Sequence, residues 1–338
     1  MDVFSWIAKN LHPKPCTSTE FFYEDVASQS GFGLPVIYQP FDANDRGHWR
    51  DRGAMLDFLY STGGEGQTLL DFGPGDGWPS LIVAPSAHEV VGVDGSRRRI
   101  DVCTENARRL GVRNVRFLYA QPGTSLPFLD EVFDGAMAAS SVEQTPDPQA
   151  TLRELHRILR RGGRLRIFYE SLSAYRDGRE REFELDEITL HTCWLTIYDR
   201  HIEKEYAAIV RLKLALSRPD ALAKLSDDGR TLAWGKLTVD LLEELRSRIL
   251  EAKACRLTHP SGGTLTAWLR EIGFRQVEST HSGAWFAGQL FDELPAAVRP
   301  RTIQEVDDLL RPLVKVVIQM PAPIHTPFGA DPMITAVK

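Results

Sequence analysis

The sequence predicts an α/β fold, a doubly wound and mostly parallel sheet that carries a helical insertion. Two observations predict the sheet. Short apolar segments alternate with segments of helical spacing from about residue 53 to residue 170, which is typical of βαβ units. The first apolar segment, TLLDF at 68–72, runs directly into the glycine-rich turn GPGDG. A third observation predicts the insertion, because the alternation stops after Glu170 and a helix, glycine and strand pattern returns only after Gly263.

Each element of the alternation follows from its own pattern. The pattern AMLDFLY is helical, and the turn residues STGGEGQ end it. Further helices are expected at 78–87, at 96–112 and from Pro148 to the glycine pair Gly162 and Gly163. The expected strands are 68–72, 88–94, 114–120, 133–139, 164–170 and 332–338. Right-handed crossovers place the loops after the parallel strands at one edge of such a sheet, where ligands of open α/β sheets bind.

The same pass along the chain predicts three regions. Residues 1–52 are irregular and rich in aromatic residues, and we expect them to cover another part of the protein. Residues 53–170 and 262–338 form the sheet domain. Residues 171–261 hold mostly helical patterns. We expect this segment to be a helical insertion that forms a lid over the site of the substrate, called the acceptor below.

Composition excludes several classes of function. The 338 residues carry a formal net charge of −6, so no basic field indicates a nucleic acid partner. The four cysteines are far apart and form no CxxC pair, which argues against a metal site and against a disulfide framework. The N-terminus is not patterned as a signal peptide, and no apolar segment approaches a membrane span. We therefore expect a soluble, cytoplasmic protein, whose oligomeric state the sequence leaves open.

The glycine turn is the main candidate for a binding site. Gly73, Gly75 and Gly77 are spaced so that a ligand could approach the backbone closely, although a simple turn is an alternative. A dinucleotide fold requires G-x-G-x-x-G, and Trp78 stands where the third glycine would be. Asp94 ends the second strand, where a carboxylate can accept hydrogen bonds from a ribose. Asp94 and Asp71, the acid at the end of the first strand, together favour a ligand with an amino group, a sulfonium charge and an unphosphorylated ribose. That ligand is S-adenosylmethionine.

The sequence resembles the class I S-adenosylmethionine-dependent methyltransferases, which have a Rossmann-like sheet. It is most similar to the branch of ubiquinone and menaquinone biosynthesis enzymes, the methyltransferase type 11 group. The resemblance rests on LLDFGPGDG, on VVGVDGS, on SLPFLDEVFDGAMA and on SVEQTPDP followed by LRELHRILRRGGRLRI. It covers about residues 67 to 170, and it says little about the acceptor.

The resemblance implies a set of cofactor-binding residues. It places Asp71, Phe72, Gly73, Gly75 and Gly77 around the methionine part, Asp94, Gly95 and Ser96 at the ribose, and Gln121, Pro122 and Ser140 along the rest of the pocket. Gln121 and Pro122 stand where the family usually has an aspartate for the adenine amino group. Gln144 stands where the family often has a histidine.

The expected reaction is an in-line methyl transfer to a small-molecule acceptor, for which the protein aligns the reacting atoms and excludes water. If a general base is needed, His191 is the first candidate and Tyr198 the second, because His191, Trp194, Tyr198 and His201 could share one helix face. An arsenite acceptor is disfavoured, because clustered thiols are lacking. The alternatives are a nicotinamide-dependent oxidoreductase and a non-catalytic binding protein that kept the fold.

Overall fold

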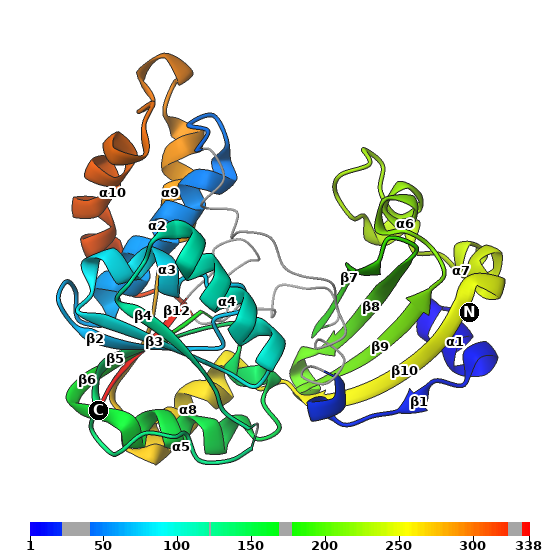
Figure 1. Ribbon diagram of the computed structural model, residues 1–338, viewed down its shortest axis with the longest axis horizontal. Coiled ribbons are helices and arrows are strands. Elements are labelled where there is room, and N and C mark those ends of the chain that lie inside the picture. The colour runs from blue at the N-terminus through cyan, green and yellow to red at the C-terminus, as the bar shows by residue number, and fades with distance from the viewer. Residues whose placement is uncertain (22–40, 122, 169–177, 324–332) are drawn as a thin grey trace. The chain divides into compact units, whose positions relative to one another are not determined.

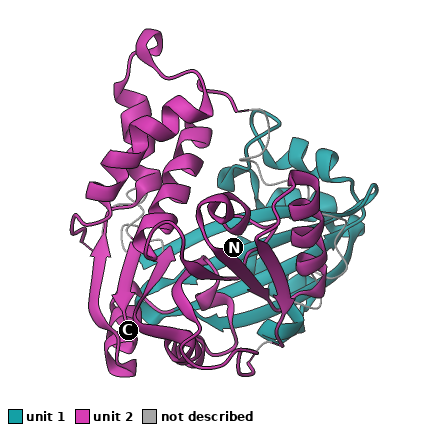
Figure 2. Cartoon of the chain, turned by 60° about the vertical axis from the view of Figure 1, so that its left-hand side comes forward, with its two compact units in different colours: residues 1–31, 175–259 teal, residues 32–174, 260–338 magenta. Residues whose placement is uncertain are grey.

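The computed structural model describes residues 1–21, 41–121, 123–168, 178–323 and 333–338. The chain divides into two compact units (Figure 2). Unit 1 comprises residues 1–31 and 175–259, and unit 2 comprises residues 32–174 and 260–338. The chain therefore leaves unit 2 after the strand that ends at Phe168 and returns to it before the helix that begins at Gly262.

Unit 2 is built on a seven-stranded sheet in the order β11-β12-β6-β5-β2-β3-β4 (Figure 1). The five strands from β6 to β4 are parallel, and β12 runs antiparallel to both of its neighbours. The register sets Leu70 beside Val91 of β3 and Ala136 of β5. The strands are β2 (Thr68–Phe72), β3 (Glu89–Asp94), β4 (Val115–Tyr119), β5 (Phe133–Ala139), β6 (Leu159–Phe168), β11 (Arg275–Thr280) and β12 (Met333–Val337). A mostly parallel, doubly wound α/β sheet is confirmed.

Helices cover both faces of this sheet (Figure 1). They are α2 (Arg46–Ser61), α3 (Ser80–Val83), α4 (Arg97–Leu110), α5 (Pro148–Ile158), α8 (Gly262–Ile272), α9 (Gly283–Glu293) and α10 (Ile303–Val317). One core joins α5 and α8 to the sheet through residues such as Leu152 and Leu265. The other core joins α2, α9 and α10 to the opposite face through Phe58, Ala287 and Leu310. Burial on both faces explains why the strand patterns are continuous apolar runs.

Unit 1 is an antiparallel sheet with helices on one face. Its order is β1-β10-β9-β8-β7, with β1 parallel to β10. Its elements are α1 (Val3–Leu11), β1 (Lys14–Pro15), β7 (Arg179–Thr189), β8 (Thr192–His201), β9 (Tyr206–Leu214), α6 (Arg218–Leu225), α7 (Val239–Leu245) and β10 (Ile249–Thr258). Its core packs alternate strand residues, including Cys193, Leu195 and Ile197 of β8, against α1, α6 and α7.

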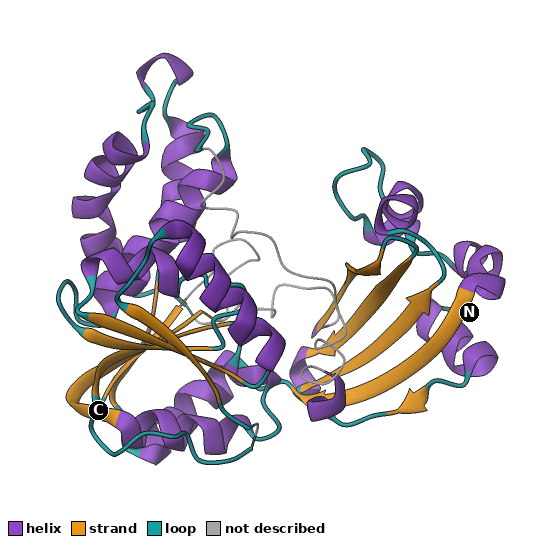
Figure 3. Cartoon of the chain, in the orientation of Figure 1, coloured by secondary structure: helices purple, strands orange, loops and turns teal. Residues whose placement is uncertain are grey.

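The prediction of a helical insertion was wrong, because most of this segment forms strands (Figure 3). The buried positions of β8 and β9 recur at every second residue on the core face, as in Val210, Leu212 and Leu214. This period of two is the signature of a half-buried strand. In β9 the residues between these core positions are the long charged Arg211 and Lys213, whereas in β8 they are Trp194, Thr196 and Tyr198. Both patterns also suit an amphipathic helix, which obscured the strand period.

Three further predictions of local structure need correction. The N-terminal region is helical at Val3–Leu11, where Asp2 caps α1, and α2 begins at Arg46 instead of residue 53. The helix expected at 78–87 is shortened to α3 and a 3₁₀ turn, since Pro79 and Pro85 interrupt the ladder of backbone bonds. The helix expected to reach Gly163 ends at Ile158, and β6 starts at Leu159. Within the described parts of the chain, no helix combines the length and the hydropathy needed to cross a bilayer.

Candidate cofactor site at the carboxyl edge of the sheet

The glycine loop follows β2 at the carboxyl edge of the parallel strands. Gly73, Gly75 and Gly77 all have left-handed backbones, with φ of 77°, 62° and 109°. Glycine adopts this conformation without steric penalty. A Cβ built at Gly73 would lie 2.5 Å from the Cβ of Ser141, and one at Gly77 would lie 2.6 Å from Leu81. A Cβ at Gly75 meets no described atom within 4 Å. Of the three glycines of this loop, the middle one therefore borders open space.

Helix α4 holds the loop from behind. The thiol of Cys103 donates to the carbonyl of Gly75 at 3.3 Å, and the amide of Asn106 donates to the carbonyl of Asp76 at 2.8 Å. The backbone N–H of Gly73 donates to Val93 at 2.9 Å, which ties the loop to β3. The loop is therefore fixed before any ligand arrives.

Asp71 lies below the loop, fully buried. Its Oδ2 accepts hydrogen bonds from the hydroxyl of Ser80 at 2.5 Å and from the Ser80 backbone N–H at 3.1 Å. Its Oδ1 is buried and has no hydrogen-bond partner among the described residues. Burial raises the pKa of Asp71 to about 7, against the lowering effect of the two Ser80 bonds. An unpaired buried carboxylate oxygen is costly, and a cationic ligand group would remove that cost.

The bonds from Ser80 also bear on the dinucleotide alternative. A pyrophosphate binds the free N–H groups at a helix N-terminus. Here the first N–H of α3 is already donated to Asp71, and α3 has only four residues. Trp78 packs edge-on against Phe58 at 5.9 Å directly before that helix. This geometry disfavours a nicotinamide dinucleotide.

Asp94 ends β3 beside the loop and is only 4% exposed. Its Oδ1 accepts the Ser96 N–H at 2.8 Å, and Arg99 lies 3.9 Å from its Oδ2. Burial raises the pKa of Asp94, while Arg99 and the backbone N–H groups of Ser96, Gly75 and Gly95 act in the opposite direction. The loop and this carboxylate are thus joined into one site.

The remaining predicted cofactor residues occupy the same edge where the structure describes them. Phe72 ends β2, and its carbonyl accepts the Ser141 hydroxyl at 2.6 Å. Ser140 follows β5 with a left-handed φ of 48° and is exposed. Gln121 follows β4, two residues after Tyr119, and its side chain is exposed. Pro122 lies outside the described residues.

The two candidate bases do not share a helix, so that part of the prediction was wrong. His191 is exposed in the turn between β7 and β8. Tyr198 is buried in β8, where its hydroxyl donates to Glu184 at 3.2 Å, and burial raises the pKa of Tyr198 well above its usual value. Trp194 lies on the same side of β8 as Tyr198, because strand residues alternate, and His201 ends that strand.

Three residues that hold Asp71 and the glycine loop in place were not predicted from the sequence. Ser80, Cys103 and Asn106 carry no motif of their own, and only the fold brings them to Asp71 and to the loop. One signal was available, because Cys103 and Asn106 are one helical turn apart on the buried side of α4.

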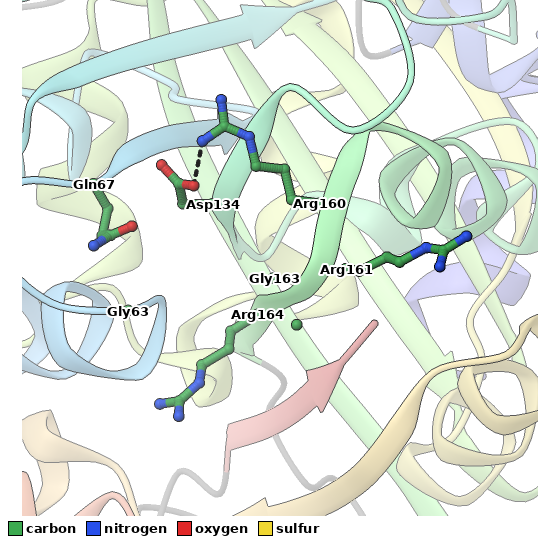
Figure 4. A pocket seen from close by; sticks show the side chains of 8 residues that line it. Gly63, Gln67, Asp134, Arg160, Arg161, Gly163 and Arg164 are labelled. Carbon is green, nitrogen blue, oxygen red and sulfur yellow. Dashed lines mark hydrogen bonds and ion pairs between the residues drawn. The ribbon is translucent and has the colours of Figure 1, made fainter.

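A separate cavity of about 270 Å³ lies at the opposite edge, around the amino ends of β2 and β5. Arg160, Arg161 and Arg164 line it together with Gln67 and Asp134. Figure 4 shows that these arginines do not converge, since Arg160 turns to Asp134 while Arg161 and Arg164 point apart. This cavity is distinct from the cofactor site.

The sheet unit is similar in sequence to methyltransferase domains. Residues 70–167 match the family model described as a methyltransferase domain. An uncharacterized methyltransferase of Bacillus subtilis (strain 168), YcgJ, is 37% identical over 98 residues, which are 28% of this chain and 38% of that protein. A demethylmenaquinone methyltransferase of Clavibacter sepedonicus is 28% identical over 242 residues, which are 69% of this chain and 79% of that protein. This chain also matches the crystal structure of the Bacillus YcgJ protein. The matched region covers 36% of this chain and 50% of the YcgJ chain, with 29% sequence identity and a TM-score of 0.33. The chain thus spans well under half of the first relative and most of the second.

Proposed function

We propose that this protein methylates a small-molecule acceptor. The premise is that residues 70–167 belong to the class I S-adenosylmethionine-dependent methyltransferase domains. The observation that carries the proposal is the bare glycine loop closed on one side by buried Asp94. The name of the Clavibacter relative gives a small molecule, demethylmenaquinone, as the acceptor of that protein. A small-molecule acceptor is proposed here by analogy.

The residues present fit S-adenosylmethionine. Asp94 would accept the ribose hydroxyls, and the open backbone at Gly75 would face the methionine part. The unpaired Oδ1 of Asp71 lies beneath the loop, where it would accept a hydrogen bond from an ammonium group, and that cation would in turn favour the ionised carboxylate. When bound, the cofactor supplies an electrophilic methyl group on a sulfonium sulfur.

The chain's own contribution to transfer is alignment and exclusion of water. We propose an in-line displacement, for which a proton acceptor is needed only if the acceptor atom carries a proton that must leave. His191 and Tyr198 stay predictions in that role. The hydrogen bond to Glu184 and the raised pKa make Tyr198 the weaker of the two.

We further propose that unit 1 supplies the acceptor-binding part of the protein. Two observations support this division. Unit 1 has its own apolar core, and its main segment is inserted between β6 and α8 of the unit that carries the glycine loop. In this proposal the inserted sheet takes the role that the sequence assigned to a helical lid.

Asp94→Ala tests the cofactor proposal by calorimetry with S-adenosylhomocysteine. Each charge-assisted hydrogen bond to ribose is worth about 1.5–3 kcal/mol, so affinity should weaken at least tenfold. Asp101→Ala, which removes an exposed carboxylate of α4, is the control and should bind like the unmodified protein. Unchanged affinity in Asp94→Ala would mean that the ribose is held elsewhere.

The same titration separates the alternatives. A nicotinamide oxidoreductase would bind NADH or NADPH, and a scaffold that kept only the fold would bind neither cofactor. Binding of S-adenosylhomocysteine without binding of NADH would leave the methyltransferase proposal standing.

A further inference from the structure

The sheet of unit 1 has two unlike faces. One face is apolar and packs on α1, α6 and α7. The other face carries polar and aromatic side chains at alternate positions of the strands, among them Glu184, Trp194, Thr196, Tyr198, Arg211, Lys213 and Lys253. We call this second surface the Trp194 face. Among the described helices and turns, Phe21 packs on this face, where it lies beside Tyr198 and Cys255.

The Trp194 face buries groups that an ordinary solvent-facing sheet would leave in water. Trp194 is 3% exposed, Arg211 is 3% exposed and Thr196 is fully buried. Long charged residues are rarely this buried unless they are paired or bound. Arg211 is accounted for, because it donates to Thr196 and to the Phe21 carbonyl and stacks on the Phe21 ring at 3.9 Å.

Cations surround the Trp194 ring. The charged groups of Arg211, Lys213 and Lys253 each lie 5.8 Å from its centroid, within the range of cation–π attraction. Lys213 is the direct cross-strand partner of Trp194, and Lys253 is the partner of Arg211. Two neighbouring strands, β9 and β10, therefore bring positive charge to one aromatic ring on β8.

Two donors of this cluster are left without acceptors. The indole Nε1–H of Trp194 is buried and makes no hydrogen bond to any residue that the structure describes. No ion pair or hydrogen bond of the Lys213 ammonium is formed with the described part of the chain. A buried donor without an acceptor costs about 1–3 kcal/mol, so a ligand that brings an acceptor would be stabilised here.

Acidic groups lie on the same face and limit where an anion could bind. Lys253 pairs with Glu251 at 3.4 Å, and Asp186 is the cross-strand partner of Trp194 on β7. Glu184 accepts from Tyr198, and burial raises the pKa of Glu184. The acids thus lie on β7 and, at Glu251 opposite Lys213, on β10, while the cations around Trp194 lie on β9 and β10. The unpaired donors are the Trp194 indole and Lys213, on the β8 and β9 side.

We propose that the Trp194 face binds a small planar acid, whose carboxylate accepts from Trp194 Nε1–H and Lys213 and whose conjugated body contacts the aromatic side chains. The donor set fits an anion, because both groups donate hydrogen bonds and one of them, the Lys213 ammonium, carries a positive charge. Resting on the proposed function, this acid is the methyl acceptor.

Nitrogen-15 spectra of the full chain test the binding, with benzoate, cinnamate, 1-naphthoate and indole-3-acetate as probes and their neutral amides as controls. Trp194→Phe assigns the indole resonance of Trp194. That resonance should move downfield with at least one acid and stay in place with its amide. If no acid of the panel moves it at about 10 mM, the proposed site does not exist.

Lys213→Met provides the energetic test, because it keeps the aliphatic stem and removes the charge. Affinity for the acid that shifts Trp194 should fall at least tenfold. Lys236→Met, a lysine of the same unit that pairs with Asp227, should leave it unchanged. Equal affinity in both variants would overturn the assignment of Lys213.

S-adenosylhomocysteine added to the same samples separates this proposal from the proposed function. Cofactor binding without any acid binding would reject the Trp194 face and leave the methyltransferase proposal intact. Acid binding without cofactor binding would leave the Trp194 face intact and reject the acid's role as methyl acceptor.

Discussion

Three glycines of one loop have different reasons to be glycine. Gly73 and Gly77 face side chains that a Cβ would strike, so they serve close packing within the protein. Gly75 faces open space, and its carbonyl is held from behind by Cys103. A side chain at Gly75 would therefore meet no protein atom, and in the proposed complex it would collide with the cofactor.

Gly75→Val tests this distinction. The left-handed backbone makes the variant less stable by about 1–2 kcal/mol, and the branched side chain should block the cofactor. A ligand at a hundred times its dissociation constant adds about 2.7 kcal/mol to the unmodified protein, and it should add almost nothing to this variant. Thermal melts with and without S-adenosylhomocysteine measure both effects.

Gly111→Val is the matched control for that experiment. Gly111 has a φ of 69°, also borders open space, and ends α4 away from the loop. It should lose stability in the same way and keep its gain from the ligand. A Gly75→Val protein that gains as much as the control would show that the glycines only make a turn.

Asp71 gives the second prediction at the residue scale. Its pKa is raised from 3.8 to about 7 by burial, so the folded state holds a proton that the unfolded state has lost between these values. Stability from this group is fully present below about pH 4 and is lost as the pH rises towards 7. Asp71→Asn removes this dependence, because the amide does not titrate. Urea unfolding at pH 5, 6, 7 and 8 should show the variant gaining stability relative to the unmodified protein as pH rises. A constant difference across these four values would contradict the buried, unpaired state of Asp71.

At the scale of elements, one buried ion pair joins the sheet to its helices. Arg166 of β6 is fully buried and makes two bonds to Asp57 of α2, at 2.8 and 2.9 Å. The same guanidinium donates to Thr280 of β11 and to Thr335 of β12, each at 2.6 Å. Asp57 also accepts the N–H of Gly283, the first residue of α9, at 2.7 Å. Five elements therefore depend on a single pair of charges.

Arg166→Leu should destabilise unit 2 by about 3–5 kcal/mol, since it leaves the Asp57 carboxylate buried without its counter-charge. Arg116→Leu is the control on another strand of the same sheet, where the pair with Glu89 is largely exposed and worth about 0–1 kcal/mol. Chemical denaturation of both variants makes the comparison. Similar losses in the two variants would show that the buried network contributes no more than a surface pair.

At the scale of the whole molecule, two units each have a core of their own. The core of unit 1 lies between its antiparallel sheet and α1, α6 and α7, and the cores of unit 2 lie on both faces of the mostly parallel sheet. The glycine loop, Asp71 and Asp94 all belong to unit 2. The Trp194 face belongs to unit 1.

Removal of residues 1–31 and 175–259, with a short Gly-Ser linker between 174 and 260, should therefore leave a folded unit 2. Because every predicted cofactor residue remains, its affinity for S-adenosylhomocysteine should stay within a few-fold of the full chain. Methyl transfer should be lost, since the proposed acceptor-binding part is gone. Calorimetry and a turnover assay check the two halves, and a folded unit 2 that cannot bind the cofactor would refute the division of labour.

The sequence by itself determined the parallel sheet and the position of the glycine loop in this protein. Both are local in origin: strands such as TLLDF and HEVVGVD are continuous apolar runs, and an acid or a glycine marks the point where each reaches the carboxyl edge. Gly75 and Asp94 could be proposed as cofactor residues because the proposal needs only the end of their own strand.

Only the tertiary structure decided the nature of unit 1 and the state of the buried acids. Segments such as TCWLTIYDRH carry apolar residues that suit a strand or a helix, and pairing with neighbouring strands distant in sequence resolved the ambiguity. The sequence placed Asp71 beside the loop, and the structure adds that Ser80, nine residues away, bonds one of its oxygens. The cations around Trp194 come from two strands, β9 and β10, and their position beside the ring on β8 depends on register, which a linear pattern does not contain.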